Sequence, residues 1–432
     1  MADNITHKGT LFWLAYPGNF DNDDNGQIVI MADMANTDFE VAIPGLAFNV
    51  AGTASPGSPG LVTIPSQAAI RSNEVIEDKG IRVTASHPVT VVFYSPELPT
   101  TSTEAYLALP VAALASLPLT AHQPLATLAY REDISDRGVD PDLAPSQMTI
   151  VATEDGTSIT VIPSCVSLSG SQTGEPIHIT LNQGQTWQYA CGHKGDTTGT
   201  IVTANKPIAI YGGNRCADIP PTIMSCDYLA EQLIPTSLLG IDYLIPPLQN
   251  GTANLVRVLA IKDNTIVRLD DGIDPMIVTL NAGEVFDSIY SLPVHVTSNR
   301  RIYVGQYGSG GLNPPPNNDR DPFFMQIIPT NRFLTEHRFF SIPEYSMNYI
   351  NIVAPPGTNV ALDGAPVDGF AAMPNSNHMW VALEVGPGEH TVTADAPVMV
   401  YMYGFNFATG YGYPAGLLVR RARRPSRGFD LL

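Results

Sequence analysis

Positive charge is scarce in this chain, and long apolar runs are missing. The sequence has 22 Lys and Arg against 41 Asp and Glu, and the formal net charge of −19 opposes binding to a nucleic-acid backbone because like charges repel. The longest apolar run, 105–119, falls short of the ~20 residues of a membrane helix and contains two prolines. The first residues lack the basic start and apolar stretch of a secretory signal. The sequence therefore predicts no nucleic-acid partner, no membrane span and no N-terminal secretion signal.

Catalytic motifs are also missing. The sequence contains no G-x-S-x-G, H-E-x-x-H, phosphate loop or G-x-G-x-x-G, and its nine histidines are scattered. Carboxylates are plentiful, but no pattern singles out a pair of them for glycosidase chemistry. We therefore predict a protein that is not an enzyme and needs no cofactor.

What the sequence has in abundance is strand and turn residues. There are 36 glycines and 37 prolines, 44% of residues are hydrophobic, and only 15% are charged. This composition is typical of a folded, core-forming protein with frequent turns, and the many Val, Ile, Thr and Tyr residues favour strands over helices. An all-β fold follows.

One phrase, of the type V-T-A-x-x-P-V-x-V-Y, occurs four times. Its copies are 81–95, 200–213, 294–308 and 390–404, and their threonines are separated by 119, 94 and 96 residues. A second phrase precedes each copy, and in two of these the dipeptides Asp-Gly and Asp-Asn separate alternating strands, where a positive φ costs little. The order of the two phrases is the same each time, which indicates an internal repeat.

The repeat length indicates the kind of module. It is far longer than a propeller blade of ~40–45 residues and matches a β-sandwich of ~100 residues. We expect four tandem β-sandwich-like repeats packed into one rigid array, and a pseudo-fourfold ring is compatible with the pattern without being required by it. The expected divisions are 1–118, 119–239 with the cysteines, 240–336, 337–416 and a basic C-terminal tail, 417–432.

Tyrosines line one face of the repeated strand, while Val, Ile and Phe line the other face and predict a core. Two interpretations of the tyrosine face stay open. The rings pack against the next module or a loop with their hydroxyls reaching water, or they form stacking platforms for a sugar or peptide. The candidate binding residues are Tyr94, Tyr211, Tyr307 and Tyr403.

All four cysteines lie between residues 165 and 226. Pairing Cys165 with Cys191 and Cys216 with Cys226 makes local sense, but four cysteines allow three connectivities and the sequence does not choose. Two disulfides, buried free thiols and a zinc site are the alternatives; the zinc site lacks a C-x₂-C pair. Disulfides would indicate an oxidising, extracellular setting.

An acidic loop is the candidate metal site. Asp21, Asp23 and Asn25 alternate ahead of a glycine, as in the first half of an oxygen-rich calcium loop, although the twelfth position holds Ala32. Calcium binding and an ordinary solvated hairpin loop are both compatible with this pattern.

The C-terminal tail is basic on an otherwise acidic chain. It is either solvated or a docking peptide for an acidic partner, such as a neighbouring copy of this chain. Its candidate binding residues are Arg420, Arg421, Arg423 and Arg424.

The segment 216–235 contains a cysteine, then Cys-Asp-Tyr-Leu, then Glu-Gln-Leu-Ile-Pro. It resembles the signature of the IgGFc-binding protein N-terminal domain family, and further phrases extend the resemblance over residues 9–416. The resemblance implies a non-catalytic, all-β, adhesive or binding module of secreted and cell-surface proteins.

From these observations we expect a non-catalytic structural or adhesive protein of an extracellular or virus-particle assembly, such as a phage tail. Its expected partners are proteins of the same assembly or a host-surface glycoprotein or glycan, and we expect a homo-oligomer. The alternative is a soluble carbohydrate-binding or glycan-active protein that uses the tyrosine faces and the calcium loop.

Overall fold

The computed structural model of the chain consists almost wholly of β-strands. The residues that it describes are 4–20, 25–96, 102–115, 125–126, 129–130, 141–223, 225–249, 254–311 and 320–420. Within them the α-helical structure is the short α1 (Val111–Ala115), and no helix of the described residues has the length and apolarity to cross a membrane. The all-β prediction is confirmed.

Long strands that take part in two different pairings organise the sheets. The first half of β10 (Ile81–Tyr94) pairs with β2 (Gly9–Leu14) and β5 (Thr37–Ile43). Its second half pairs with β4 (Gly26–Ala32) and β11 (Ala105–Leu107). The outer edges are β6 (Phe48–Ala54), beside β5, and β7 (Gly60–Ile64), beside β4.

The same order of pairing occurs around three later strands or strand pairs. Around β25 (Val294–Tyr307) the partners are β20 (Gly240–Ile245), β22 (Thr265–Asp270), β21 (Asn254–Ala260) and β26 (Phe324–Gln326). Around β33 (Gly388–Asn406) they are β27 (Leu334–Ser341), β29 (Val360–Leu362), β28 (Met347–Ala354) and β34 (Thr409–Pro414). In the remaining case two strands, β17 (Ile201–Ala204) and β18 (Ile208–Asp218), take the place of one long strand, and Pro207 lies just before the second. The first of them, β17, pairs with β12 (Leu125–Ala126) and β14 (Thr157–Ile162). The second, β18, pairs with β13 (Ser146–Ala152) and β19 (Cys226–Gln232).

Shorter strands complete the sheets. At the edges lie β9 (Ile76–Glu77), β15 (Ile177–Leu181), β16 (Thr186–Ala190), β23 (Met276–Leu280), β24 (Val285–Tyr290), β30 (Ala365–Pro366), β31 (Ala371–Ala372) and β32 (Met379–Glu384). Two further pairs are β1 (Ile5–Thr6) with β35 (Leu418–Arg420) and β3 (Tyr16–Pro17) with β8 (Ala69–Ile70).

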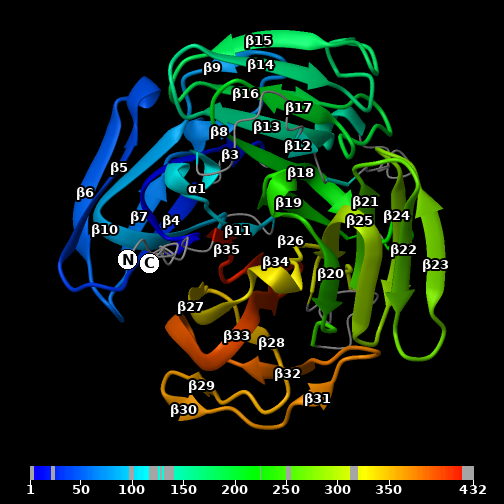
Figure 1. Cartoon of the computed structure of the whole chain (residues 1–432). Helices are drawn as coiled ribbons and strands as arrows, with labels where there is room; N and C mark the ends of the chain where they lie inside the picture. The colour runs from blue at the N-terminus through cyan, green and yellow to red at the C-terminus, as the bar shows by residue number, and fades with distance from the viewer. Residues whose placement is uncertain are drawn as a thin grey trace, which may run out of the picture.

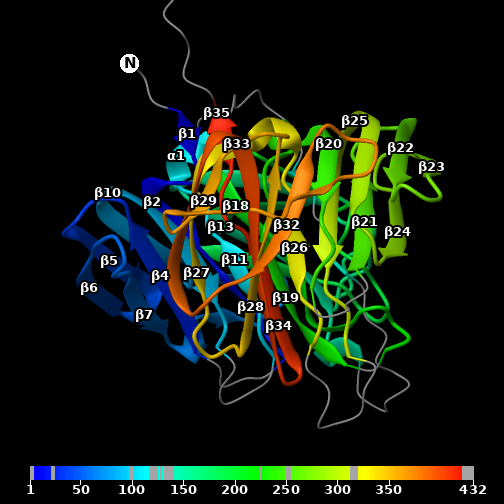
Figure 2. The same ribbon diagram turned by 90° about the horizontal axis from the view of Figure 1, so that it is seen from below.

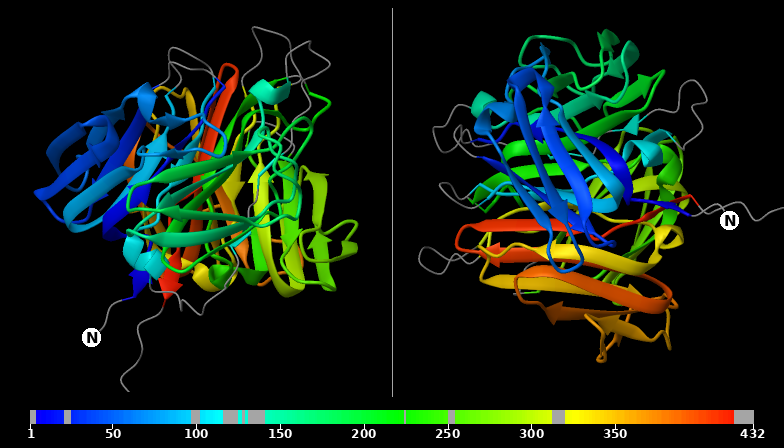
Figure 3. Two further views of the ribbon diagram at one scale, coloured as in Figure 1. Left: turned by 90° about the horizontal axis from the view of Figure 1, so that it is seen from above. Right: turned by 90° about the vertical axis from the view of Figure 1, so that its left-hand side faces the viewer.

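The four strands β11, β19, β26 and β34 meet at the centre of the molecule (Figure 1). Each is laddered to the long strand of its own sheet, and the sheets extend outward from this centre. In the left view of Figure 3 the blue N-terminal sheets and the yellow-green sheets lie on opposite sides, with red and orange strands between them. We call these four the inner strands.

Burial follows the sequence pattern. In β14, Thr157, Ile159 and Val161 are buried while Ser158 and Ile162 are exposed, as expected of a strand with one covered face. In β13 every residue is buried, because this strand lies between two other strands and is covered on both faces. The tyrosine-bearing halves of the long strands belong to such doubly covered sheets.

The turns predicted from Asp-Gly and Asp-Asn have the expected backbone. Gly156 and Asn264 have φ of 62° and 54°, in the left-handed region that glycine and asparagine reach at little cost. Asn36 and Gly357 take φ of 55° and 76° at the matching turns before β5 and β29. Turn chemistry was therefore readable from the sequence.

The structure contains the two local disulfides, Cys165–Cys191 and Cys216–Cys226. The loop that follows Cys165 holds a segment from far upstream: the hydroxyls of Ser167 and Ser171 donate to the Glu74 carboxylate. Beside this contact, β9 pairs with β16. The first disulfide thus supports a junction between segments distant in sequence.

Replacing both Cys165 and Cys191 by Ser should lower the free energy of unfolding by about 3 kcal/mol, because a loop of 26 residues is no longer closed in the unfolded chain. Urea denaturation measures this loss. Hydrogen exchange should also show weaker protection of residues 73–77. The matched control, Cys216→Ser with Cys226→Ser, should leave that protection unchanged; equal loss in both variants would contradict the junction role.

Candidate functional site

Residues of the Cys-Asp-Tyr-Leu-Ala-Glu-Gln segment form the inner strand β19 and lie at the molecular centre (Figure 1). The carboxylate of Asp227 accepts the backbone N–H of Thr103 at 2.7 Å and that of Gly410 at 3.3 Å. Thr103 lies just before β11, and Gly410 lies in β34. Asp227 therefore joins three of the four inner-strand regions.

Glu104, directly before β11, makes the complementary set of contacts. Its Oε2 accepts the N–H of Phe324 in β26 at 2.7 Å, and its Oε1 accepts the N–H of Gly412 in β34 at 3.4 Å. Glu104 is 1% exposed and Asp227 is 0% exposed, so both carboxyl groups depend on these N–H donors in place of water. Their role here is cohesion between strands.

Two glutamines make equivalent contacts between neighbouring segments. The side-chain oxygen of Gln232 accepts the N–H of Leu109 at 2.9 Å, and that of Gln326 accepts the N–H of Ile234 at 3.0 Å. In both cases the glutamine belongs to one inner strand, and the N–H that it accepts belongs to the segment that directly follows the preceding inner strand in the sequence. Gln232 belongs to the Glu-Gln-Leu signature, which gives that signature a physical function in the scaffold.

The protonation of the central carboxyl groups is shifted. Burial raises the pKa of Glu104 well above its ordinary value, although backbone N–H groups oppose the shift. Burial and the nearby Asp321 raise the pKa of Asp227, and burial with Glu104 raises that of Glu231. A raised pKa means that the folded state binds these protons more tightly than the unfolded state does. The resulting contribution to the free energy of unfolding is fully present at acid pH and is lost as the pH rises through the raised pKa values.

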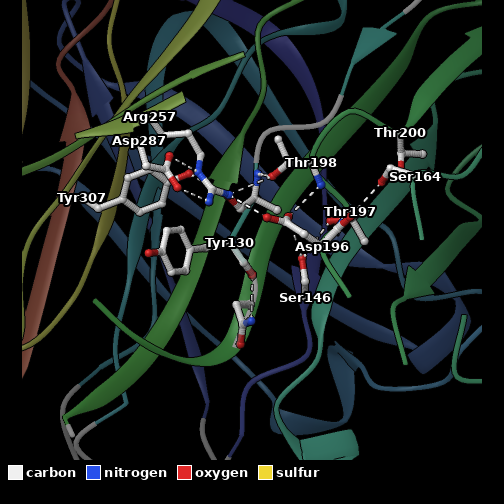
Figure 4. A network of polar contacts seen from close by, with 12 residues as sticks. Tyr130, Ser146, Ser164, Asp196, Thr197, Thr198, Thr200, Arg257, Asp287 and Tyr307 are labelled. Atoms are coloured by element: carbon white, nitrogen blue, oxygen red, sulfur yellow. Dashed lines mark hydrogen bonds and ion pairs between the residues drawn. The ribbon is translucent and has the colours of Figure 1, made fainter. Parts of the chain in front are cut away.

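A second buried network joins the second and third strand groups (Figure 4). Arg257 of β21 is 3% exposed; its Nε and Nη2 donate to Asp287 at 2.8 and 2.7 Å, and its Nη1 donates to Asp196 at 2.8 Å. Its guanidinium carbon lies 4.3 Å from the ring centroid of Tyr130, and Nη1 also donates to the Ala129 carbonyl. Bidentate pairing and ring stacking are geometries that favour arginine over lysine.

Ion pairing sets the pKa values of the charged groups in this network. Burial alone would lower the pKa of Arg257, but Asp196 and Asp287 raise it well above its ordinary value. Burial alone would raise the pKa of Asp196, but Arg257 holds it below the ordinary value of 3.8. The network therefore stays ionised at neutral pH and weakens only when the pH falls through 3.8 and below.

The four tyrosines predicted as binding residues are buried. Tyr94 is 4% exposed, and Tyr211, Tyr307 and Tyr403 are 0% exposed, whereas a stacking platform must present a ring face to its ligand. Tyr307 stacks on Phe324 with centroids 4.6 Å apart, and its hydroxyl donates to the Ala129 carbonyl. The ligand-stacking interpretation is wrong for these residues, because their half-strands are covered on both faces.

The other predicted site residues fall at the margins. Asn25 accepts a hydrogen bond from the N–H of Ser66 at 3.1 Å, and Arg420 is exposed at the end of β35, paired with Ile5. Asp21 and Asp23, like Arg421, Arg423 and Arg424, lie outside the described residues. Among the residues that are described, no group of three or more His, Cys, Asp or Glu side chains is arranged to hold a metal ion.

Two outer grooves lie on solvent-facing sheets. The first, of about 400 Å³, lies over β14, β15 and β17 and is lined in part by Ser158, Thr160, His178, Thr180, Thr203 and Asn205. The second, of about 500 Å³, lies over β29 and its neighbours and is lined in part by Asn359, Ala361, Pro366, Asp368, Thr393 and Asp395. Hydroxyl, amide and carboxylate groups lie among apolar side chains in both grooves and offer hydrogen bonds there. Sequence reasoning did not single them out.

The grooves occupy matching positions. In the first, the N–H of Ser158 donates to Asn205 at 2.9 Å; in the second, the N–H of Asn359 donates to Asp395 at 3.0 Å. Each accepting residue lies just after the Val-Thr-Ala phrase of its strand group. The later part of the repeated phrase thus forms a buried strand, and the residue that follows its Val-Thr-Ala part forms a polar edge of the groove.

Comparison with known proteins assigns the chain to a family. The family model described as IgGFc binding protein matches residues 104–404, and the chain belongs to this family. It is also similar to the IgGFc-binding protein of Homo sapiens, with 26% identity over 281 residues, which is 62% of this chain and 5% of the human protein. The chain therefore corresponds to a small part of that relative's length.

Solved structures add only distant likenesses. An adhesin with which an Antarctic bacterium binds ice shows 8% identity over 96% of this chain and 99% of its own, with a TM-score of 0.13. A 1.5-MDa bacterial ice-binding adhesin shows 7% identity over 76% of this chain and 98% of its own, also with a TM-score of 0.13. Scores this low carry no argument about fold or function.

Glu104→Gln should lower the free energy of unfolding by about 1 to 3 kcal/mol, because the amide NH₂ cannot accept the N–H groups that the carboxyl oxygens accept. Urea denaturation at pH 7 measures the effect. The exposed Glu175→Gln is the matched control and should change stability by no more than about 0.5 kcal/mol. Equal stability of the two variants would contradict a cohesive role for Glu104.

Arg257→Met should cost about 3 kcal/mol at pH 7, because Asp196 and Asp287 lose their common cation. At pH 3 the loss should shrink, since protonated carboxyl groups no longer need Arg257. Arg268→Met is the control: its partner Asp270 is buried but Arg268 itself is 42% exposed, and such pairs contribute about 0 to 1 kcal/mol. A pH-independent loss in Arg257→Met would show that packing, and not charge, is the contribution removed.

Proposed function

We propose that the chain is a non-catalytic, extracellular binding protein that adheres to a protein or glycoprotein partner through its solvent-facing sheets. The observation that carries this proposal is membership of the IgGFc binding protein family over residues 104–404. The buried cohesion of the centre supports it, because the family signature serves the scaffold and leaves the outer surface for contact. The two disulfides fit an oxidising compartment.

The scaffold is best understood as repeated modules. We take the strand groups around β10, β17 with β18, β25 and β33 as four copies of one sandwich-like unit, with divisions at 1–118, 119–239, 240–336 and 337–416. A recurring hydrogen bond supports this: a side chain after the Val-Thr phrase accepts a backbone N–H from the neighbouring strand. The acceptors are Ser86, Asn205, Asn299 and Asp395.

The outer grooves are the proposed contact surface. They are open to solvent, rich in hydrogen-bonding groups and built on rigid strands, which limits the entropy lost on binding. A polar groove of this kind accepts an extended peptide or the hydroxyl groups of a glycan. The carbohydrate-binding alternative therefore rests on these grooves and no longer on the buried tyrosines.

The basic tail and the assembly state belong to the same proposal. Residues 418–420 form β35 and pair with β1, so the segment available for docking starts at residue 421. We propose that it meets an acidic surface of a neighbouring copy, because the chain carries a net charge of −19. A virus particle or phage-tail-like assembly is the finer form of this proposal.

Thr160→Arg should weaken binding to an immobilised glycoprotein panel that includes immunoglobulin Fc, because the long cation fills the first outer groove. Biolayer interferometry before and after enzymatic deglycosylation separates protein from glycan recognition. Thr279→Arg, on the exposed face of β23 outside both grooves, is the control and should bind as the parent chain does. Full binding by Thr160→Arg would remove that groove from the contact surface.

Light scattering after size exclusion should show a multiple of the chain mass for the full chain and a smaller species for a chain ending at Arg420. A single-chain mass for both, at low and physiological salt, would contradict tail-mediated assembly. The truncated chain keeps β35, so its folding is not at issue.

A further inference from the structure

The two ends of the described chain meet at one end of the molecule, where β1 lies beside β35 (Figure 2). Ile5 faces Arg420, and the N–H of His7 donates to the Leu417 carbonyl at 3.2 Å. This contact closes the seam between the first and last strand groups. It is a short pairing, so its stability depends on the side chains packed beneath it.

His7 is the central side chain of this seam and is fully buried. Its Nδ1 accepts the N–H of Leu417 at 3.2 Å, and because an N–H can only donate, Nδ1 carries no proton. Nε2 therefore carries the proton and lies 3.3 Å from the Thr90 hydroxyl of β10. The chain packs tightly on the ring: a Cβ at Gly416 would lie 2.2 Å from it.

A second buried histidine lies in the same seam. His337 of β27 has Nε2 2.9 Å from the Val398 carbonyl and Nδ1 3.3 Å from the Ala415 carbonyl. Ala415 is two residues before Leu417, so both rings contact the same short segment. His337 and Lys8 both oppose a positive charge on His7.

Charged groups surround the pair. Lys8 lies 2.6 Å from Asp33, directly after β4, and 3.2 Å from Glu336 of β27. Arg338 of β27 binds Asp33 at 2.8 Å and also pairs with Glu389 of β33. The nearby acids thus already have cationic partners, and the partial support that Asp33 gives to a charged His7 is outweighed by burial, Lys8 and His337.

We propose that this seam is an acid-sensitive latch, in which protonation of His7 at Nδ1 breaks its hydrogen bond with Leu417 and frees residues 417–420 from the body of the protein. The added proton occupies the Nδ1 lone pair that accepted the Leu417 N–H, so the Nδ1–H of His7 and the N–H of Leu417 then face each other. Among the residues that the structure describes, no carboxylate is in hydrogen-bonding contact with the buried cation that forms. Opening exposes the ring to water and releases the segment that leads into the basic tail.

The acid dependence has a defined direction. Burial lowers the pKa of His7 from 6.5 to about 3, with Lys8 and His337 adding to the shift. Between these values the open, solvated histidine binds a proton that the closed one does not, so closure is strongest above pH 6.5 and weakens as the pH falls. At pH 5 the closing equilibrium should be about 30-fold weaker than at neutral pH.

The remaining structure responds later. The Arg257 network keeps its charges until the pH falls through the ordinary aspartate value of 3.8. Between about pH 6.5 and 4 the latch therefore weakens while that junction holds. Mild acid should increase opening of the terminal segment without general unfolding.

Hydrogen exchange of the full chain, followed by mass spectrometry from pH 7.5 to 4 and corrected for the intrinsic rates, tests the latch. Protection of residues 5–9 and 415–420 should fall about 30-fold by pH 5, while protection of β13 stays constant. Constant protection of the two terminal segments over the whole range would overturn the proposal.

His7→Asn provides the specific variant, because its side-chain oxygen replaces Nδ1 as the acceptor and does not titrate. Its terminal protection should lose most of the acid response, and the part that remains reports His337, whose pKa burial also lowers. The exposed His193→Asn is the matched control and should respond as the parent chain does. A full acid response in His7→Asn would assign the latch to another group.

Imidazole NMR of the parent chain keeps the proposal testable if His7→Asn does not fold. Opening should be coupled to His7 protonation, so the fall in terminal protection and the His7 titration should share one pH range. A His7 ring that is protonated at pH 6.5 while residues 415–420 remain protected would refute the latch.

Discussion

Carboxyl and amide side chains that accept backbone N–H groups hold the centre of this protein together. The inner strands β11, β19, β26 and β34 are each laddered to a different long strand, and no ladder joins them among the described residues. The contacts between them are instead made by Glu104, Asp227, Gln232 and Gln326. A buried N–H without an acceptor costs about 1 to 3 kcal/mol. By accepting the N–H groups at the strand ends, these side chains offset that cost and also fix how the sheets meet.

The seams around this centre are chemically different from one another. Arg257 and its aspartates join the second and third groups, buried histidines and a surface charge network join the first and last, and Glu74 with its serines joins the first and second. Repetition of the strand pattern therefore does not extend to the junctions. We expect each seam to respond to a different condition: strong acid, mild acid or reduction of the nearby disulfide.

Local features of the fold were readable from the sequence, because they depend on neighbouring residues. The alternation in β14 and the positive φ of Gly156 and Asn264 follow directly from side-chain period and turn chemistry. For the tyrosine face the sequence left ring packing and ligand stacking open, because alternation reports only that two faces differ. Tyr307 packs against Phe324, as the first interpretation expects, but its hydroxyl does not reach water. Its hydroxyl instead reaches a carbonyl of a distant segment. Glu104 and Arg257 carried no local signal at all, since their partners lie far away in the sequence.

The position of the family signature changes what family membership implies. Asp227 and Gln232 are buried at the centre and bind backbone groups, which are present whatever the side chains of the neighbouring segments are. A signature of this kind constrains how the sheets assemble and places no constraint on exposed residues such as Ser158 or Asn359. A centre held by backbone acceptors is therefore compatible with different side chains in the outer grooves, which we propose as the contact surface. The partner that we propose for this chain should accordingly be sought at its exposed residues, because Asp227 and Gln232 do not reach the solvent.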